Sequence, residues 1–156
     1  MQTRHVAVIG APPDAVFAVA ADVERWPSLH RAYRWCRVLE RGSDRLVFEM
    51  AGLIRGWPAR WTAIQERSPA ARHLAFRHIK GITTGMRVNW SLLPHQDGTS
   101  VLLEHDLVIS WPLVGETITN WIVGPVFIDW IARQTLMAVK QAAEHVEEGA
   151  SCDVWW

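Results

Sequence analysis

Side chains that can bind a ligand or move a proton gather in the segment VERWPSLHRAYRW, residues 23–35. Tyr33, the one tyrosine of the chain, has a phenol that can donate a hydrogen bond to a carbonyl oxygen. Histidine gains and loses a proton near neutral pH, so His30 is a candidate proton mover. Trp26 and Trp35 add large apolar rings that a loop in water rarely carries. The segment therefore predicts a covered site with Tyr33 as hydrogen-bond donor.

Each of these side chains also has a structural interpretation. Tyr33 could be a buried phenol bonded to a backbone carbonyl, and His30 could be a helix-end or surface histidine. His105 lies on the more apolar face of its predicted strand, where it is either a ligand contact or a satisfied core histidine. Arg77 could pair with a carbonyl or carboxylate, or be a solvated strand residue. The residues alone leave these alternatives open.

The elements that must position these side chains can be predicted from periodicity. Residues 3–9 alternate as a strand, and the sequence AlaProProAsp then opens a helix with proline in its first turn. A short helix is expected from Val23 to His30. Breaks rich in Gly, Pro, Ser and Asp then separate six predicted strands, near 33–40, 45–52, 57–66, 72–80, 85–93 and 99–110. Residues 113–149 read as helix, interrupted or kinked at Gly124 and Pro125.

This order predicts an α+β fold. One N-terminal strand and a six-strand meander form a curved antiparallel sheet of about seven strands, wrapped around a long C-terminal helix. The helix has an apolar stripe for this contact: Val126, Ile128, Ile131, Leu136, Met137, Val139, Ala142 and Val146. We expect a single domain over residues 1–150, a tail over 151–156, and a cavity between sheet and helix.

Strand alternation predicts which side chains face that cavity. Trp57, Ala59, Trp61 and Ala63 share one face of their strand, and Arg60 lies on the other. The apolar faces of the last two strands are Met86, Val88, Trp90 and Leu92, and Val101, Leu103, His105, Leu107 and Ile109. Tyr33 and Trp35, two residues apart, should point to the same side. The expected ligand contacts are therefore Trp26, Trp57, Trp61, Trp90 and His105.

Composition excludes several classes of function. Sixteen basic and sixteen acidic residues leave no net charge, which argues against a nucleic-acid partner. The seven histidines and two cysteines show no metal-ligand spacing, so neither a metal nor another cofactor is expected. The longest uncharged run is too short to span a bilayer, and two distant cysteines suit a reducing cytoplasm. Ten tryptophans in 156 residues are unusual and suit an aromatic-walled pocket.

The TrpPro pair at 26 and 27, the APPDAVF helix opening and the element order resemble the START-like superfamily, also called helix-grip, Bet v 1-like or SRPBCC proteins. Within it, residues 3–148 look most like the bacterial polyketide cyclase/dehydrase group, which includes aromatase/cyclases. The resemblance places Trp26, Pro27, His30 and Tyr33 at the cavity. It also matches Trp90 to an inward tryptophan of the group, and Arg77 to an arginine on the preceding strand.

One pattern of the group is absent. Aromatase/cyclases carry Trp-x-Ser-x-Arg on a middle strand, where the arginine is thought to polarise a carbonyl. After Trp61, this chain has Ala63 and Gln65 at those two places. Arg67 fills the role only if the alignment slips by two residues, and Arg60 would have to reach inward from the opposite face.

The resemblance implies cyclisation or dehydration of an elongated polyketide or aromatic intermediate, with an acyl carrier protein as a candidate partner that presents it. Its implied catalytic residues are Tyr33, His30 and Arg77. The alternative is a non-catalytic carrier of a hydrophobic metabolite such as a quinone or lipid. A third hypothesis is a protein- or lipid-surface module that uses Trp111, Trp155 and Trp156.

Overall fold

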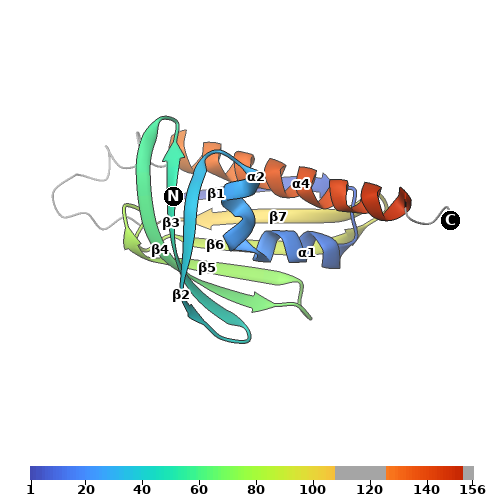
Figure 1. Ribbon diagram of the computed structural model, residues 1–156, viewed down its shortest axis with the longest axis horizontal. Coiled ribbons are helices and arrows are strands. Elements are labelled where there is room, and N and C mark those ends of the chain that lie inside the picture. Colours follow the sequence, from blue (N-terminus) through green and yellow to red (C-terminus); the bar gives the residue numbers. More distant parts are fainter. Residues whose placement is uncertain (108–125, 153–156) are drawn as a thin grey trace.

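The computed structural model describes residues 1–107 and 126–152. Trp111, Trp155 and Trp156, on which the surface-module hypothesis depends, lie outside these ranges. Over the described residues a strand comes first, short helices and six further strands follow, and a long helix comes last (Figure 1). The elements are β1 (Gln2–Ile9), α1 (Pro13–Ala21), the 3-10 turn η1 (Val23–Arg25), α2 (Trp26–Leu29), β2 (Tyr33–Arg41), β3 (Arg45–Ile54), β4 (Trp57–Ser68), β5 (His73–Gly81), β6 (Arg87–His95), β7 (Gly98–Asp106) and α4 (Asp129–Cys152).

The seven strands form one antiparallel sheet in the order β1-β7-β6-β5-β4-β3-β2. Figure 1 shows that β2, β3 and β4 run across the direction of β1 and β7, so the sheet is strongly curved. Helix α4 lies along the β1–β7 side, and α1 and α2 cover the same concave face. The predicted α+β architecture, a curved sheet around a long terminal helix, is confirmed.

The predicted apolar stripe of α4 is correct only in part. Ile131, Leu136 and Val139 are buried against the sheet, together with the small residues Ala132 and Ala143. Val126, Met137 and Val146 are instead 39%, 54% and 52% exposed, because the buried face is narrower than the predicted stripe. The predicted interruption at Gly124 and Pro125 lies outside the described residues. No described helix combines the length and apolar composition that a bilayer span requires.

Two hydrogen bonds fasten α4 to the end of β1, and an ion pair within the helix joins their two side chains. The Gly10 N–H donates to Glu144 Oε1 at 2.9 Å, and Lys140 Nζ donates to the Val8 carbonyl at 2.8 Å. Lys140 also binds Glu144 at 2.7 Å, and this contact lowers the pKa of the glutamate, with a smaller effect from the Gly10 N–H. These contacts set where the helix lies over the concave face.

The connection from β1 to α1 depends on Gly98, where β7 begins. Gly98 has φ +130°, and a Cβ there would lie 2.2 Å from the Ile9 carbonyl oxygen. Its neighbour Thr99 is fully buried and donates its hydroxyl to the Ala11 carbonyl at 2.7 Å. The chain therefore passes from β1 into α1 directly against β7, with no space for a side chain.

Gly98→Ala should lower the free energy of unfolding by about 2 kcal/mol or more, because both the backbone angle and the contact with Ile9 become strained. Gly149→Ala is the matched control, since a Cβ at this helical position meets nothing within 4 Å. The control should be neutral or slightly stabilising. Chemical denaturation measures both, and equal stability of the two variants would contradict this account.

Candidate functional site

A cavity lies between the concave face of the sheet and α4. Its volume is about 70 Å³, counted as the space open to the centres of water-sized molecules. The described lining is mostly apolar and carries no lysine, arginine, aspartate or glutamate. Its polar side chains are Tyr33, His78, Thr83, His105 and Thr135. The cavity thus combines an apolar wall with a few neutral polar groups, which is typical of a small-molecule site.

Aromatic rings form much of this wall. The Trp26 ring centroid lies 5.3 Å from that of Tyr33, 5.9 Å from Phe76 and 6.4 Å from Trp90. All of these ring pairs are tilted, an arrangement that suits the quadrupoles of aromatic rings. Trp61 completes the wall from β4, edge-on to Tyr33. The helix α2, which starts at Trp26, therefore supplies the centre of an aromatic cluster that the strands surround.

The Tyr33 hydroxyl reaches across the cavity to α4. It forms a short hydrogen bond with Thr135 Oγ1, and the Thr135 hydroxyl lies 2.7 Å from the Ile131 carbonyl oxygen. Because a carbonyl only accepts, the threonine proton goes to Ile131 and the tyrosine proton goes to Thr135. Burial raises the pKa of Tyr33 well above its usual value, so the phenol stays protonated.

His78 is a buried histidine at the cavity that is held by two neighbours. Its Nδ1 lies 2.6 Å from Thr83 Oγ1, and its ring stacks on Trp61 with centroids 5.9 Å apart. Burial, with a smaller effect from His105, lowers the pKa of His78 to about 3. This imidazole is therefore neutral at physiological pH and links the β5–β6 turn to the sheet.

His105 and Trp26 hold the cavity's unpaired polar atoms. The Nδ1 atom of His105 and the Nε1 atom of Trp26 are buried and have no hydrogen-bond partner among the described residues. Burial, with a smaller effect from His5, lowers the pKa of His105 to about 4. Unpaired buried polar atoms are costly and need an explanation, and a ligand that supplies the missing partners is one.

The structure brings together Tyr33, Trp26, Trp61, Trp90 and His105 from the expected site. It places Trp57 elsewhere: this residue begins β4 at the β3–β4 turn and is 68% exposed. Its expected position in the cavity wall is corrected, because the strand extends beyond the covered part of the sheet.

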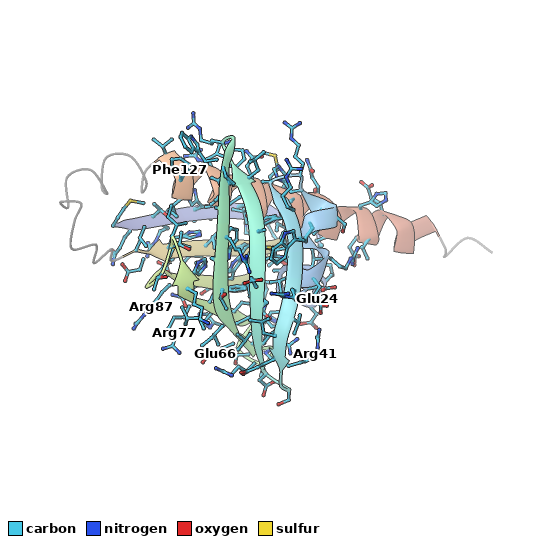
Figure 2. All side chains as sticks on the ribbon, turned by 60° about the vertical axis from the view of Figure 1, so that its left-hand side comes forward. Glu24, Arg41, Glu66, Arg77, Arg87 and Phe127 are labelled. Carbon is cyan, nitrogen blue, oxygen red and sulfur yellow. The ribbon has the colours of Figure 1, made fainter. Side chains whose placement is uncertain are left out.

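His30 and Arg77 are also not among the lining residues. His30 Nδ1 accepts the Ala32 N–H at 3.0 Å, so the proton is on Nε2, which lies 3.1 Å from Gln134 Oε1 on α4. Arg77 is exposed on the outer face of the sheet, opposite Arg87. Figure 2 shows both arginines pointing away from the helices. His30 therefore joins the β2 entrance to α4, and Arg77 faces solvent.

A β-bulge overturns the prediction that Tyr33 and Trp35 face the same way. Tyr33 pairs with Gly52 and Trp35 with Ala51, so Arg34 is an extra residue in β2. Tyr33 is consequently 5% exposed inside, while Trp35 is 40% exposed outside. There the Arg37 and Arg60 guanidiniums lie 6.0 and 5.6 Å from the Trp35 ring centroid.

Comparison with known sequences assigns the chain to a family. Residues 9–140 match the family described as "Polyketide cyclase / dehydrase and lipid transport". The chain belongs to this family. The match runs from the last residue of β1 to the middle of α4 and so contains every described residue that lines the cavity.

Among curated relatives, the granaticin polyketide synthase bifunctional cyclase/dehydratase of Streptomyces violaceoruber is 30% identical over 112 residues. The match covers 70% of this chain but only 35% of that protein. The chain therefore spans about a third of the length of this relative.

Solved structures of other proteins share the fold. TTHA0849 from Thermus thermophilus is 20% identical, with a TM-score of 0.82 and coverage of 94% of this chain and 99% of that one. The ZhuI aromatase/cyclase from Streptomyces sp. R1128 is 22% identical, with a TM-score of 0.73 and coverage of 95% and 93%. A START superfamily protein from Mycobacterium smegmatis is 16% identical, with a TM-score of 0.68 and coverage of 96% and 98%. The predicted START-like, helix-grip fold is confirmed.

The residues at the Ser and Arg places of the aromatase/cyclase pattern do not line the cavity. Ala63 and Gln65 are fully buried, and Gln65 Nε2 donates to the Ala21 carbonyl at 2.9 Å. Arg60 binds Glu49 at 2.8 Å on the outer face, and Arg67 donates to the Ser43 carbonyl at 3.0 Å. The two alternative arginines are thus bound to partners elsewhere.

Sequence reasoning missed His78, Thr83 and Thr135. Strand alternation contained a signal for His78, which shares a face with Leu74 and Phe76, whereas Arg77 occupies the opposite face. Thr135 is four residues after Ile131 on the buried side of α4, where a hydroxyl marks a polar position in the core. No local pattern identifies Thr83, because its position depends on how the β5–β6 turn folds back onto His78.

The two buried histidines should make folding stability depend on pH. Their pKa values, about 3 and 4, lie below the value of about 6.5 in an unfolded chain. As pH falls, these histidines therefore take up protons in the unfolded state before they do so in the folded state. Their contribution to the free energy of unfolding is complete above about pH 6.5 and is lost as pH falls below that value. Between pH 7 and pH 5 each of the two histidines should lower the free energy of unfolding by about 2 kcal/mol.

Denaturant unfolding at pH 7, 6 and 5 measures the effect. His105→Gln should reduce the pH-dependent loss by about half, while His95→Gln, which changes a histidine outside the cavity, should preserve it. If the free energy of unfolding of His105→Gln depends on pH in the same way as that of the wild type, His105 is not a source of the pH dependence.

Proposed function

We propose that the protein is a cofactor-independent polyketide cyclase/dehydratase. It binds one end of an elongated polyketide or aromatic intermediate in the cavity and promotes cyclisation or loss of water. The observation that carries the proposal is that Tyr33, a protonated phenol, and His105, a neutral imidazole, line the same apolar cavity. Family membership and the name of the granaticin relative support this chemistry.

Tyr33 is the proposed electrophilic group. A ligand carbonyl that accepts the phenol proton replaces Thr135 as its partner. The Thr135 hydroxyl can then turn from the Ile131 carbonyl and donate to the Tyr33 oxygen. Two hydroxyls in series polarise the carbonyl more strongly than one, because each hydrogen bond strengthens the next. The group acts as a fixed dipole toward the negative charge that develops on oxygen.

His105 is the proposed base. Its unpaired Nδ1 can accept the proton of a carbon flanked by two carbonyls, and the resulting enolate carbon forms a bond to a second carbonyl carbon. The imidazolium then returns this proton to the alkoxide oxygen, which gives the hydroxyl of the aldol product. In a second cycle His105 takes the remaining proton from the same carbon and delivers it to that hydroxyl, which leaves as water while the carbon–carbon double bond forms. Protons balance within the site, so no external acid is needed. In this scheme His105 has the catalytic role that the sequence assigned to His30.

The shape of the cavity supplies the rest of the proposed catalysis. Trp26, Trp61 and Trp90 restrict the ligand to folded conformations, and such confinement can contribute several kcal/mol to a ring closure. The small volume suits the reacting end of a chain whose remainder stays outside. Delivery of that chain as a thioester on an acyl carrier protein fits this arrangement and is part of the proposal.

A reactive poly-β-ketone thioester, supplied free or on a carrier protein, tests the proposal by product analysis. The wild-type protein should change the distribution of cyclised products relative to buffer. Tyr33→Phe and His105→Gln should each reduce the rate at least about 100-fold, as expected for loss of an acid or base group. The surface variants His95→Gln and Trp57→Phe should keep the wild-type rate.

Circular dichroism must show that all four variants are folded. Binding without any change in products would favour the carrier alternative and reject the enzyme. Wild-type rates in Tyr33→Phe or His105→Gln would remove that residue from the mechanism.

A further inference from the structure

The described lining of the cavity has no permanent cation that could balance a negative charge. None of its described lining residues is a lysine or arginine, and residues 108–125, which the structure does not describe, contain neither type. The outer face of β2–β4, in contrast, has Arg37 and Arg60, both bound to Glu49 at 2.8 Å. Cations are thus present on the outer face of these strands and missing from the described lining of the cavity.

The two cavity histidines do not replace the missing cation. Both are buried and neutral at physiological pH, and protonation of either is opposed by the other or by His5. His78 is further committed to Thr83 by its hydrogen bond. A carboxylate in this cavity would lose its hydration and gain no opposite charge, which is costly.

The polar atoms that remain without partners define what the cavity can accept. Trp26 Nε1–H is a donor and matches a carbonyl oxygen. His105 Nδ1 can accept a hydrogen bond from a hydroxyl group. Most of the remaining wall is aromatic and aliphatic, so a compact ring can pack against it.

We propose that the cavity selects neutral ligands that carry both a carbonyl and a hydroxyl or enol group, and that it excludes carboxylates of the same shape. This inference rests on the proposed function, since it names the substrate class of the same site. It assigns Trp26 a specific role as the donor to a ligand carbonyl, beyond its role as a wall. It also implies that a free acid is a poor substrate even when its carbon skeleton is correct.

Two small probes of matched shape test the selection. 3-Hydroxyacetophenone and 3-hydroxybenzoate have the same ring and hydroxyl and differ in having a neutral methyl ketone or a carboxylate. Isothermal titration at pH 7.5 should show the ketone binding on the order of 100-fold more tightly to the wild-type protein. Equal binding of the two probes, tighter binding of the acid, or no ketone binding at millimolar concentration would overturn the inference.

Matched variants locate the bound ketone. Trp26→Phe keeps an aromatic ring but removes the N–H, and should weaken ketone binding about five- to tenfold. His105→Gln should weaken it as well, and serves as the second variant if Trp26→Phe does not fold. Trp57→Phe, the same change at an exposed position, should leave it unaltered. Ketone affinity unchanged in both cavity variants would place the probe elsewhere and reject the assignment.

The outcome is independent of turnover. Selective ketone binding by a protein that does not change polyketone products would reject the proposed function and keep this inference. Altered products together with equal binding of ketone and acid would do the reverse.

Discussion

Two adjacent hydrogen bonds between residues 30–33 and α4 determine the geometry of the site. His30 bonds Gln134, and Tyr33 bonds the neighbouring Thr135, so the beginning of β2 is held directly against the helix. The bulge after Tyr33 makes this possible, because it lets Tyr33 point inward while the rest of β2 follows the sheet. Farther along, Lys140 and Glu144 hold α4 against the end of β1, and at the start of the helix Asp129 Oδ1 lies 3.2 Å from His5 Nε2 of β1.

The cost of burying charge explains why the cavity is polar in places and yet has an uncharged described lining. Hydroxyl, imidazole and indole groups can be buried if they find a hydrogen-bond partner, whereas a buried cation also needs a counterion. Arg37 and Arg60 lie instead on the outer face of the sheet, where Glu49 supplies the counterion and the Trp35 ring lies beside both guanidiniums. These two arginines therefore stabilise the outside of the sheet, and the described lining of the cavity is left to neutral dipoles.

The sequence was sufficient for the architecture and for part of the site. Strand periodicity located all seven strands within a few residues. The apolar faces containing Trp90 and His105 are buried as predicted, except that Ile109 lies outside the described residues. It failed where position depends on tertiary structure. Alternation placed Trp57 on the face of Trp61 but could not show that the covered region ends between them, and a one-residue bulge reversed Trp35 relative to Tyr33.

The catalytic candidates show the same limit in chemical terms. His30 and Arg77 were selected by residue type and by resemblance, but His30 is bound to Ala32 and Gln134 outside the cavity, and Arg77 faces solvent. The chain has Ala63 and Gln65 at the places of the group's serine and arginine, and the described cavity offers no other cation. Polarisation of a carbonyl must then come from oriented neutral groups, the Tyr33–Thr135 pair and the Trp26 N–H. Such dipoles are effective in an apolar site because water does not screen them and they need little reorganisation when charge develops. In the proposed reaction the oxyanion forms together with the His105 imidazolium, so the net charge of the cavity stays at zero, whereas a carboxylate would bring a net charge into it. The proposed catalysis and the preference for neutral ligands therefore have the same physical origin.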